Sequence, residues 1–235
     1  MKDKINVIAF DADDTLWVNE PYFQETEKQF CALLENYAPH HTLSQELFRI
    51  EMKNLPLYGY GIKSFMLSMI EAVYDISGGT ADMKLIPEII RLGQEMLQHP
   101  IELLDGVREV LEALKGRYRL VVATKGDLLD QERKLKKSGL LDYFHHIEIM
   151  SDKKADDYRK LLKRLDCTPD EFLMMGNSLK ADVIPVLELN GYAAHIPYHT
   201  MWAHEHYEGN LDHPRFLQLN TITDILNHVD HETRN

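Results

Sequence analysis

Polar and charged side chains follow four short apolar runs of this 235-residue chain. The first run ends in Asp11-Ala12-Asp13-Asp14-Thr15 and the second in Thr124-Lys125. The third is followed by Ser151-Asp152-Lys153-Lys154, and the fourth by Gly176-Asn177-Ser178 and then Asp182. A polar residue ends almost any strand, so one of these sites alone would mean little. Four together predict a shared site of carboxylate, hydroxyl, amide and ammonium groups.

The carboxylates of Asp11, Asp13 and Asp182 would repel one another if they gathered at this site. Two like charges ~4 Å apart at an effective dielectric constant of ~20 repel by about 4 kcal/mol. Lys153 alone does not balance three carboxylates. Oxygen ligands without His or Cys suit Mg²⁺, which also accepts a phosphate oxygen. The sequence therefore predicts a Mg²⁺ site that recruits a phosphoryl group.

The apolar runs have the length and composition of strands that are buried on both faces. Between the later runs lie segments of helical period, such as Val107, Val110, Leu111 and Leu114. This alternation predicts an α/β fold with a doubly wound, Rossmann-like parallel sheet, whose ligands bind at the carboxyl ends of the strands. The expected strands are Ile5 to Phe10, Leu120 to Ala123, Ile147 to Met150, Phe172 to Met175 and Tyr192 to Ile196.

Residues 17–100 interrupt this alternation and contain no convincing strand. Helical stripes such as Phe30, Leu33, Leu34 and Tyr37 indicate helices, with breakers at Pro39, at residues 54–61 and at residues 77–79. We therefore expect an inserted α-helical cap domain over residues 17–100. The core domain is expected to comprise residues 1–16 and 101–235, with a polar tail after residue 206 that ends in one short helix near residues 222–229.

The spacing Asp11-x-Asp13-x-Thr15, together with Thr124, Lys153 and Gly176-Asn177-Ser178-(x)3-Asp182, resembles the four motifs of the haloacid dehalogenase superfamily. The order of the motifs and their positions at strand ends are specific when taken together. This resemblance implies a Rossmann-like core, a helical cap of the first type and Mg²⁺-dependent phosphoryl transfer through an aspartyl-phosphate.

The resemblance assigns a role to each matching residue. Asp11 is expected to be the nucleophile, and Asp13 the general acid and base. Thr124, with Lys125 beside it, is expected to bind the phosphoryl group, while Lys153 neutralises its charge. Lys153 is preferred to Lys154 because it lies nearer the strand end. The expected metal ligands are Asp11, Asp13, Asn177 and Asp182.

Two residues depart from the commonest pattern of the superfamily. Asp14 stands where Gly often follows the second Asp, and we interpret it as a hydrogen-bond acceptor that stabilises the loop. Asn177 stands where Asp is frequent. Its amide oxygen brings no charge, so metal affinity is expected to be weaker and Asp182 more important.

Substrate choice is expected to come from cap residues that reach over the nucleophile. The candidate substrate-binding residues are Trp17, Tyr58, Tyr60 and Lys63, which combine loop-borne aromatic rings with a cation. The alternative is that the aromatic side chains pack within the small core of the cap.

Three other functions share some of these features. A metal-free haloacid dehalogenase would not carry a carboxylate at the position of Asp13. A signalling receiver domain would have its phosphoacceptor in the middle of the chain and no helical insert. A catalytically inactive binding module on the same scaffold remains an alternative. The His-rich stretch from His195 to His206 lacks an HExxH motif and is interpreted as packing and hydrogen-bonding groups rather than a zinc site.

The overall composition limits the partners of the chain. It has 26 basic and 38 acidic residues, a net charge of −12, which disfavours nucleic acid and anionic lipid. Cys31 and Cys167 form no disulfide framework, and no apolar window has the length of a membrane span or a signal peptide. We expect a cytoplasmic, Mg²⁺-dependent phosphatase that acts on a small phosphorylated metabolite as a monomer or homodimer.

Overall fold

The computed structural model describes residues 4–229 of the chain, which form two compact units. The first unit takes in the residues up to 20, residues 101–125 and those from 132 onward. The second consists of residues 21–100 and 126–131. The domain boundaries expected at residues 17 and 100 remain predictions beside this division.

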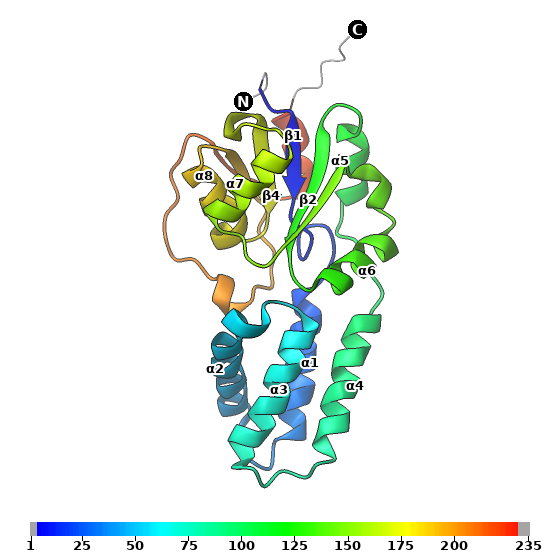
Figure 1. Cartoon of the computed structure of the whole chain (residues 1–235), viewed down its shortest axis with the longest axis vertical. Coiled ribbons are helices and arrows are strands. Elements are labelled where there is room, and N and C mark those ends of the chain that lie inside the picture. The colour runs from blue at the N-terminus through cyan, green and yellow to red at the C-terminus, as the bar shows by residue number, and fades with distance from the viewer. Residues whose placement is uncertain (1–3, 230–235) are drawn as a thin grey trace. The chain divides into compact units, whose positions relative to one another are not determined.

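The first unit is built on a six-stranded parallel sheet with the strand order β3-β2-β1-β4-β5-β6. Figure 1 labels β1 and its two neighbours, β2 and β4. The chain proceeds outward from β1 to β3 and then returns to the other side of β1 with β4. Ligands of such sheets bind where the order reverses, here beyond the ends of β1 and β4. The expected doubly wound α/β fold is confirmed. The strands are β1 (Val7–Phe10), β2 (Arg119–Lys125), β3 (His146–Met150), β4 (Phe172–Gly176), β5 (Tyr192–His195) and β6 (Phe216–Gln218).

Both faces of the sheet are buried, which explains why the strands are apolar throughout. In β1, Ile8 and Phe10 belong to one core cluster and Val7 and Ala9 to the other, as the alternation of side chains requires. The first cluster includes residues of α5 and α6, and the second includes residues of α7 and α8. The helices are α5 (Val107–Leu114), α6 (Leu128–Ser138), α7 (Ala155–Arg164) and α8 (Ile184–Glu188).

The C-terminal part of the sheet differs from the expectation. The sequence predicts no strand after residue 206, but Phe216–Gln218 form β6, which pairs with β5. A strand of three residues is too short for its periodicity to be recognised. The expected terminal helix is present as the 3₁₀ helix η5 (Ile222–Asn227). The other short turns are η1 (Leu141–Tyr143), η2 (Pro169–Glu171), the π-helical turn η3 (Leu179–Val183) and η4 (Ala203–Glu205).

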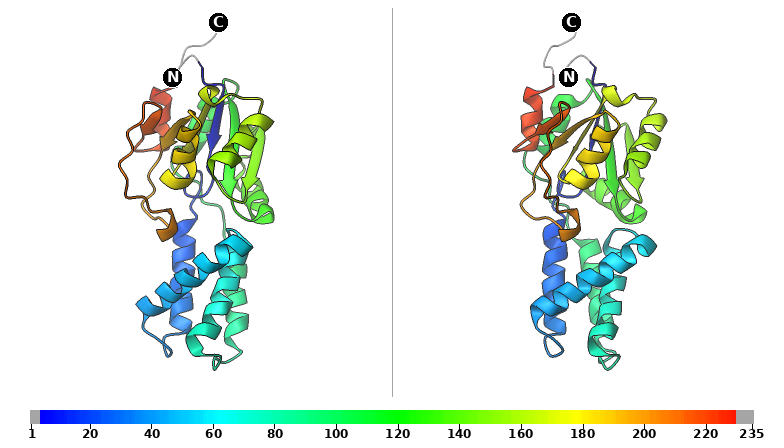
Figure 2. Two further views of the ribbon diagram at one scale, coloured as in Figure 1. Left: turned by 60° about the vertical axis from the view of Figure 1, so that its left-hand side comes forward. Right: turned by 90° about the vertical axis from the view of Figure 1, so that its left-hand side faces the viewer.

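The second unit contains four long helices (Figure 2). Their buried apolar side chains form a core of their own. The expected helix break at residues 54–61 is wrong for residues 54–58, because α2 continues through Pro56. Its buried face includes Asn54, whose amide donates to Ser68 Oγ at 3.2 Å, so a polar residue interrupts the apolar pattern. The helices are α1 (Glu20–Leu33), α2 (His40–Tyr58), α3 (Ile62–Ser77) and α4 (Leu85–Gln98).

None of the helices within residues 4–229 combines the length and the apolar character that crossing a membrane requires.

Candidate active site

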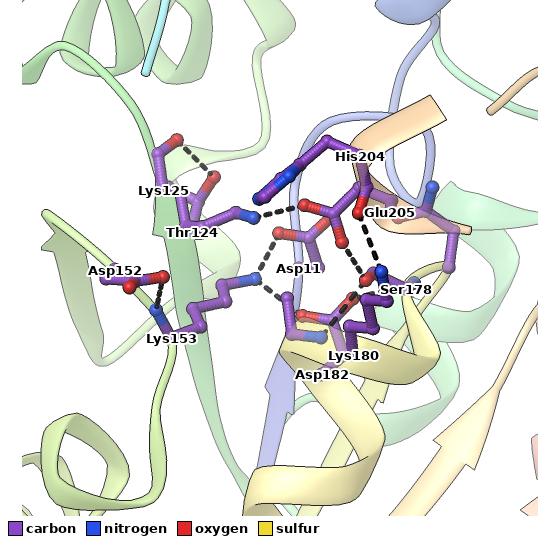
Figure 3. Close-up of polar contacts among 12 residues, drawn as sticks. Asp11, Thr124, Lys125, Asp152, Lys153, Ser178, Lys180, Asp182, His204 and Glu205 are labelled. Carbon is purple, nitrogen blue, oxygen red and sulfur yellow. Dashed lines mark hydrogen bonds and ion pairs between the residues drawn. The ribbon is translucent and has the colours of Figure 1, made fainter. Parts of the chain in front are cut away.

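The centre of the site is a buried group of two carboxylates and one ammonium (Figure 3). Asp11 directly follows β1, Lys153 follows β3, and Asp182 lies in η3 after β4. Lys153 Nζ donates to Asp182 Oδ1 at 2.7 Å and also to Asp11 Oδ1. The side chains of Asp11, Lys153 and Asp182 are 10%, 1% and 1% exposed. Ionised, this group carries one negative charge more than the ammonium compensates.

The burial of this group shifts its proton affinities. Burial raises the pKa of Asp11 to about 7, and the charge of Asp182 adds to the rise, although Lys153 opposes it. Burial alone would lower the pKa of Lys153, but attraction to Asp11 and Asp182 outweighs burial and raises it. Lys153 is therefore protonated at neutral pH. Positive charge that approaches Asp11 favours its ionised form.

The backbone between β4 and η3 explains how Asp182 reaches this group. The Ser178 N–H donates to Asp182 Oδ2 at 3.0 Å, and Ser178 Oγ accepts from the Ala181 N–H at 3.1 Å. A Cβ atom at Gly176 would clash with the Asp182 carboxylate, so this close approach requires glycine. Tyr158 adds a hydrogen bond from its hydroxyl to the Ala181 carbonyl oxygen at 3.0 Å.

Asn177 lies near the second oxygen of Asp11. Thr15 Oγ1 is 3.4 Å from both Asp11 Oδ2 and Asn177 Oδ1. His195 Nε2 lies 3.0 Å from the Asn177 backbone oxygen, so this histidine has the hydrogen-bonding role expected of it. Thr15 thus links the Asn177 amide oxygen to Oδ2 of Asp11, whereas Lys153 contacts Oδ1.

These residues fit a hard divalent cation. Asp11, Asn177 and Asp182 supply only oxygen atoms, and the buried pair of carboxylates carries excess negative charge. Within residues 4–229, no group of three or more His, Cys, Asp and Glu side chains is arranged to hold a metal ion. A cation at Asp11 would therefore need the Asn177 amide and water molecules, which Mg²⁺ tolerates well.

Asp13 belongs to a second group with its own cation. Its Oδ1 accepts from Trp17 Nε1 at 2.7 Å and from Lys134 Nζ at 2.9 Å. Lys134 also donates to Asn19 Oδ1 at 2.8 Å. The Asp13 carboxylate thus contacts Lys134, whereas Asp11 and Asp182 share Lys153. The expectation that all three carboxylates bind one metal ion remains a prediction. Nothing in the sequence distinguishes Lys134 from the neighbouring lysines of α6.

Asp14 acts as the loop acceptor that its sequence position suggests. Its backbone is left-handed, with φ of 58°, a region that Asp tolerates better than most residues. Its carboxylate accepts from the N–H of Asn19 at 2.9 Å and from the N–H of Glu20 at 2.9 Å, where α1 begins. Burial raises the pKa of Asp14 to about 7, although these N–H groups oppose the rise.

Thr124 and Lys125 end β2 beside this centre. Thr124 is buried, and its hydroxyl donates to the Lys125 carbonyl oxygen at 3.2 Å. Lys125 Nζ donates to Glu205, whose carboxylate also accepts from Ser178 Oγ. Sequence reasoning missed Glu205 as part of the site, because the stretch that contains it is interpreted as packing and hydrogen-bonding groups without a role at the strand ends.

The structure distinguishes between the two candidate lysines after β3. The Lys153 side chain is buried against Asp11, whereas Lys154 is 77% exposed and pairs with Asp152 at 2.8 Å. Only Lys153 therefore reaches the centre.

The four candidate substrate-binding residues do not all belong to the same unit of the chain. Trp17 is completely buried in the core of the first unit, where it holds Asp13, so its position does not support contact with a substrate. Tyr58 is the last residue of α2 rather than a loop residue, and it is 51% exposed. Tyr60 lies between α2 and α3, and Lys63 lies in α3. These three belong to the second unit, and their approach to Asp11 remains a prediction.

Comparison with known proteins identifies relatives of the chain. A family model described as haloacid dehalogenase-like hydrolase matches residues 5–186. Among curated proteins, the human N-acylneuraminate-9-phosphatase is 24% identical over 118 residues. That match spans 48% of this chain and 48% of the relative, so the chain spans about half the length of this relative.

Solved structures extend the likeness over nearly the whole chain. A haloacid dehalogenase-like family hydrolase from Xanthomonas campestris is 37% identical with a TM-score of 0.84, covering 93% of this chain and 87% of that chain. The putative hydrolase YfnB from Bacillus subtilis, bound to magnesium, is 17% identical with a TM-score of 0.64, covering 96% and 99% of the two chains. Dehalogenases are also among the similar structures. The matches below 25% identity, which include YfnB and the dehalogenases, show the fold alone.

Proposed function

Because the chain belongs to the haloacid dehalogenase-like hydrolase family, we propose that it is a phosphatase that cleaves a small phosphomonoester through an aspartyl-phosphate on Asp11. The observation that carries the proposal is the position of Asp11 at the end of β1, where the strand order reverses, with Lys153 donating to its carboxylate. The likeness to a human phosphatase supports the same reaction. The net charge of −12 favours a small phosphorylated metabolite over nucleic acid or an anionic membrane.

The reaction divides between the two carboxylates that lie two residues apart. An oxygen of Asp11 attacks phosphorus in line, the bond from phosphorus to the ester oxygen breaks, and the leaving alkoxide takes a proton from Asp13. Water then attacks the phosphorus of the aspartyl-phosphate while Asp13 accepts its proton. The bond between phosphorus and Asp11 breaks, which releases inorganic phosphate and restores the carboxylate.

The remaining polar groups stabilise the charge that develops on phosphorus. The Lys153 ammonium lies where it neutralises both the nucleophile and the transferring group. Thr124 and Lys125, at the end of β2, are the proposed ligands of the phosphoryl oxygens. Asp182 keeps Lys153 in place through the contact at 2.7 Å.

The proposed cofactor is Mg²⁺, held by Asp11, Asn177 and Asp182. When bound, it supplies positive charge to the phosphoryl oxygens and to the buried carboxylates. The raised pKa of Asp11 supports this assignment, because the carboxylate must be ionised to attack.

A metal-free dehalogenase is the second candidate, because dehalogenases share the fold. The presence of Asp13 favours the phosphatase. An alkoxide leaving group needs a proton donor, whereas a departing halide needs none, and Asp13 is a carboxylate held at 2.9 Å by Lys134. A catalytically inactive binding module would not require a nucleophile, a proton donor and a buried ammonium at the positions of Asp11, Asp13 and Lys153.

The test is a release assay over a panel of phosphorylated metabolites and 2-haloacids, run with Mg²⁺ and with EDTA. We expect phosphate release that requires Mg²⁺ and is lost in Asp11→Asn, with no halide release. Halide release that persists in EDTA would favour the dehalogenase. Phosphate release that survives Asp11→Asn would contradict the proposed nucleophile, and silence across the panel would favour the binding module.

A further inference from the structure

A long connection between β5 and β6 contributes a carboxylate to the site. Residues 196–215 link these two parallel strands, and the regular structure within them is the short turn η4 (Figure 2). Connections longer than ~12 to 15 residues without secondary structure of their own are uncommon in compact domains and usually serve a function. Its length therefore calls for an explanation beyond joining two strands.

Contacts from two different strand ends anchor this connection through η4. Glu205 accepts from Lys125 Nζ and from Ser178 Oγ, and Lys180 Nζ donates to the His204 carbonyl oxygen at 3.0 Å (Figure 3). Lys125 is the last residue of β2, and Ser178 follows β4. Because β2 and β4 are the two neighbours of β1, the Glu205 carboxylate bridges the elements on either side of the strand that ends at Asp11.

The ion pair between Lys125 and Glu205 is largely buried, because each side chain is only 15% exposed. Burial alone would raise the pKa of Glu205, but the Lys125 ammonium and the Ser178 hydroxyl hold it below its usual value, so the carboxylate is ionised at neutral pH. A buried ion pair is a weak source of stability, because desolvation offsets the attraction. Its placement at the strand ends indicates that it fixes the geometry of the site.

We propose that Glu205 is a positioning residue that holds the Lys125 ammonium beside Asp11 for contact with the phosphoryl group. This inference rests on the proposed phosphatase function. Lys has a long, flexible side chain whose head group adopts many positions, and a fixed carboxylate partner restricts them. Glu205 itself touches neither the reacting atoms nor the nucleophile; it acts through Lys125.

The test is a double-mutant cycle with para-nitrophenyl phosphate as substrate and inorganic phosphate as the binding probe. The variants are Glu205→Gln, Lys125→Met and the double variant, with Glu208→Gln as the matched control. Glu208 lies on the same connection, and its side chain is 89% exposed. Phosphate binding is measured by calorimetry, which requires no turnover.

We expect Glu205→Gln to raise KM and the Kd for phosphate about tenfold, the effect of misplacing one charge-assisted contact, with a smaller change in kcat. The double variant is expected to be no weaker than Lys125→Met alone, since both changes remove the same contact. Glu205→Asp, which keeps the charge on a shorter side chain, should fall between wild type and Glu205→Gln. Glu208→Gln should match wild type.

Two outcomes would overturn the inference: wild-type KM and Kd in Glu205→Gln, or effects of Glu205→Gln and Lys125→Met that multiply in the double variant. Multiplying effects would mean that Glu205 supports the fold independently of Lys125. The parallel Asp11→Asn assay separates this failure from that of the proposed function. If hydrolysis depends on Asp11 while Glu205→Gln is silent, only the positioning role fails.

Discussion

Charged side chains are buried at the carboxyl ends of the strands in the first unit, here called the sheet edge, but not in the helical segment 21–100. At the sheet edge, Asp11, Asp14, Lys153 and Asp182 are all buried. Within residues 21–100, by contrast, every buried polar side chain is neutral. The ion pairs of the helical segment, such as Arg91 with Glu95, lie on its surface, where each side chain is about half exposed.

This difference indicates that different forces stabilise the two regions. Surface ion pairs add little stability, because solvent screens them and ordering the side chains costs entropy. The helical segment therefore depends on its apolar core. The sheet edge carries buried charges that stabilise each other only as a complete set, since removal of one partner leaves an uncompensated charge. Such an arrangement is typical of a site selected for chemistry rather than stability.

The largest effect is expected when the central cation is removed. Lys153→Met leaves Asp11 and Asp182 buried without their ammonium, and it should lower the free energy of unfolding by about 3 to 5 kcal/mol. Phosphatase activity should also be lost. Urea unfolding and phosphate release measure the two effects.

The matched control is Arg91→Met in the helical segment, which breaks exposed ion pairs with Glu88 and Glu95. We expect no measurable change in stability or activity. If both variants lose the same amount of stability, the distinction between the two regions fails.

The second effect concerns pH. The pKa of Asp14 is raised to about 7 in the folded chain by burial, so its stabilising contribution is present below its ordinary pKa and is lost as the pH rises through 7. The wild-type free energy of unfolding should fall between pH 5 and 7 by at most about 1.4 kcal/mol per pH unit from this group and level off above pH 7. Asp14→Asn should show a shallower fall in urea unfolding over the same range.

Glu46, a partly exposed carboxylate of the helical segment, provides the comparison. The Arg49 hydrogen bond lowers the pKa of Glu46, so Glu46→Gln should leave the pH dependence between 5 and 8 unchanged. If the free energy of unfolding of wild type and of Asp14→Asn depends on pH in the same way, burial does not raise the pKa of Asp14.

The smallest effect is expected at the second group of the sheet edge. Lys134→Met removes the ammonium from Asp13 and Asn19 but leaves the contact from Trp17 at 2.7 Å. Asp13 should remain near its position, and kcat should fall roughly tenfold, the effect of one lost charge-assisted hydrogen bond. Lys136→Met, an exposed change on the same helix, is the control. Equal kcat values for Lys134→Met and Lys136→Met would show that Lys134 does not contribute to catalysis.

The fold was predictable where strands are buried on both faces, because uninterrupted apolar runs of five or so residues carry the signal. The sequence pattern does not reveal the helix at residues 40–58, since its buried face includes the polar Asn54, whose partners lie on another helix. The strand β6 is not predictable in this way, because three residues are too few to show a period.

The site was predictable only where strand ends carried the chemistry. Asp11, Lys153 and Asp182 lie at or just beyond strands, and the order of those strands brings them together. Lys134 and Glu205 could not be identified in this way. Lys134 is 121 residues from Asp13 in sequence, and Glu205 is 80 residues from Lys125. Contacts of such sequence separation depend on the tertiary fold, and neither residue belongs to a motif.

The proposed mechanism requires that the Asp11 carboxylate becomes phosphorylated during turnover. It is tested most directly by acid quenching of the enzyme during hydrolysis of its preferred phosphomonoester, followed by mass spectrometry of the proteolytic peptides. We expect one added phosphoryl group on Asp11 and none in Asp11→Asn. Turnover without any phosphorylated peptide, or a phosphoryl group on another residue, would contradict it.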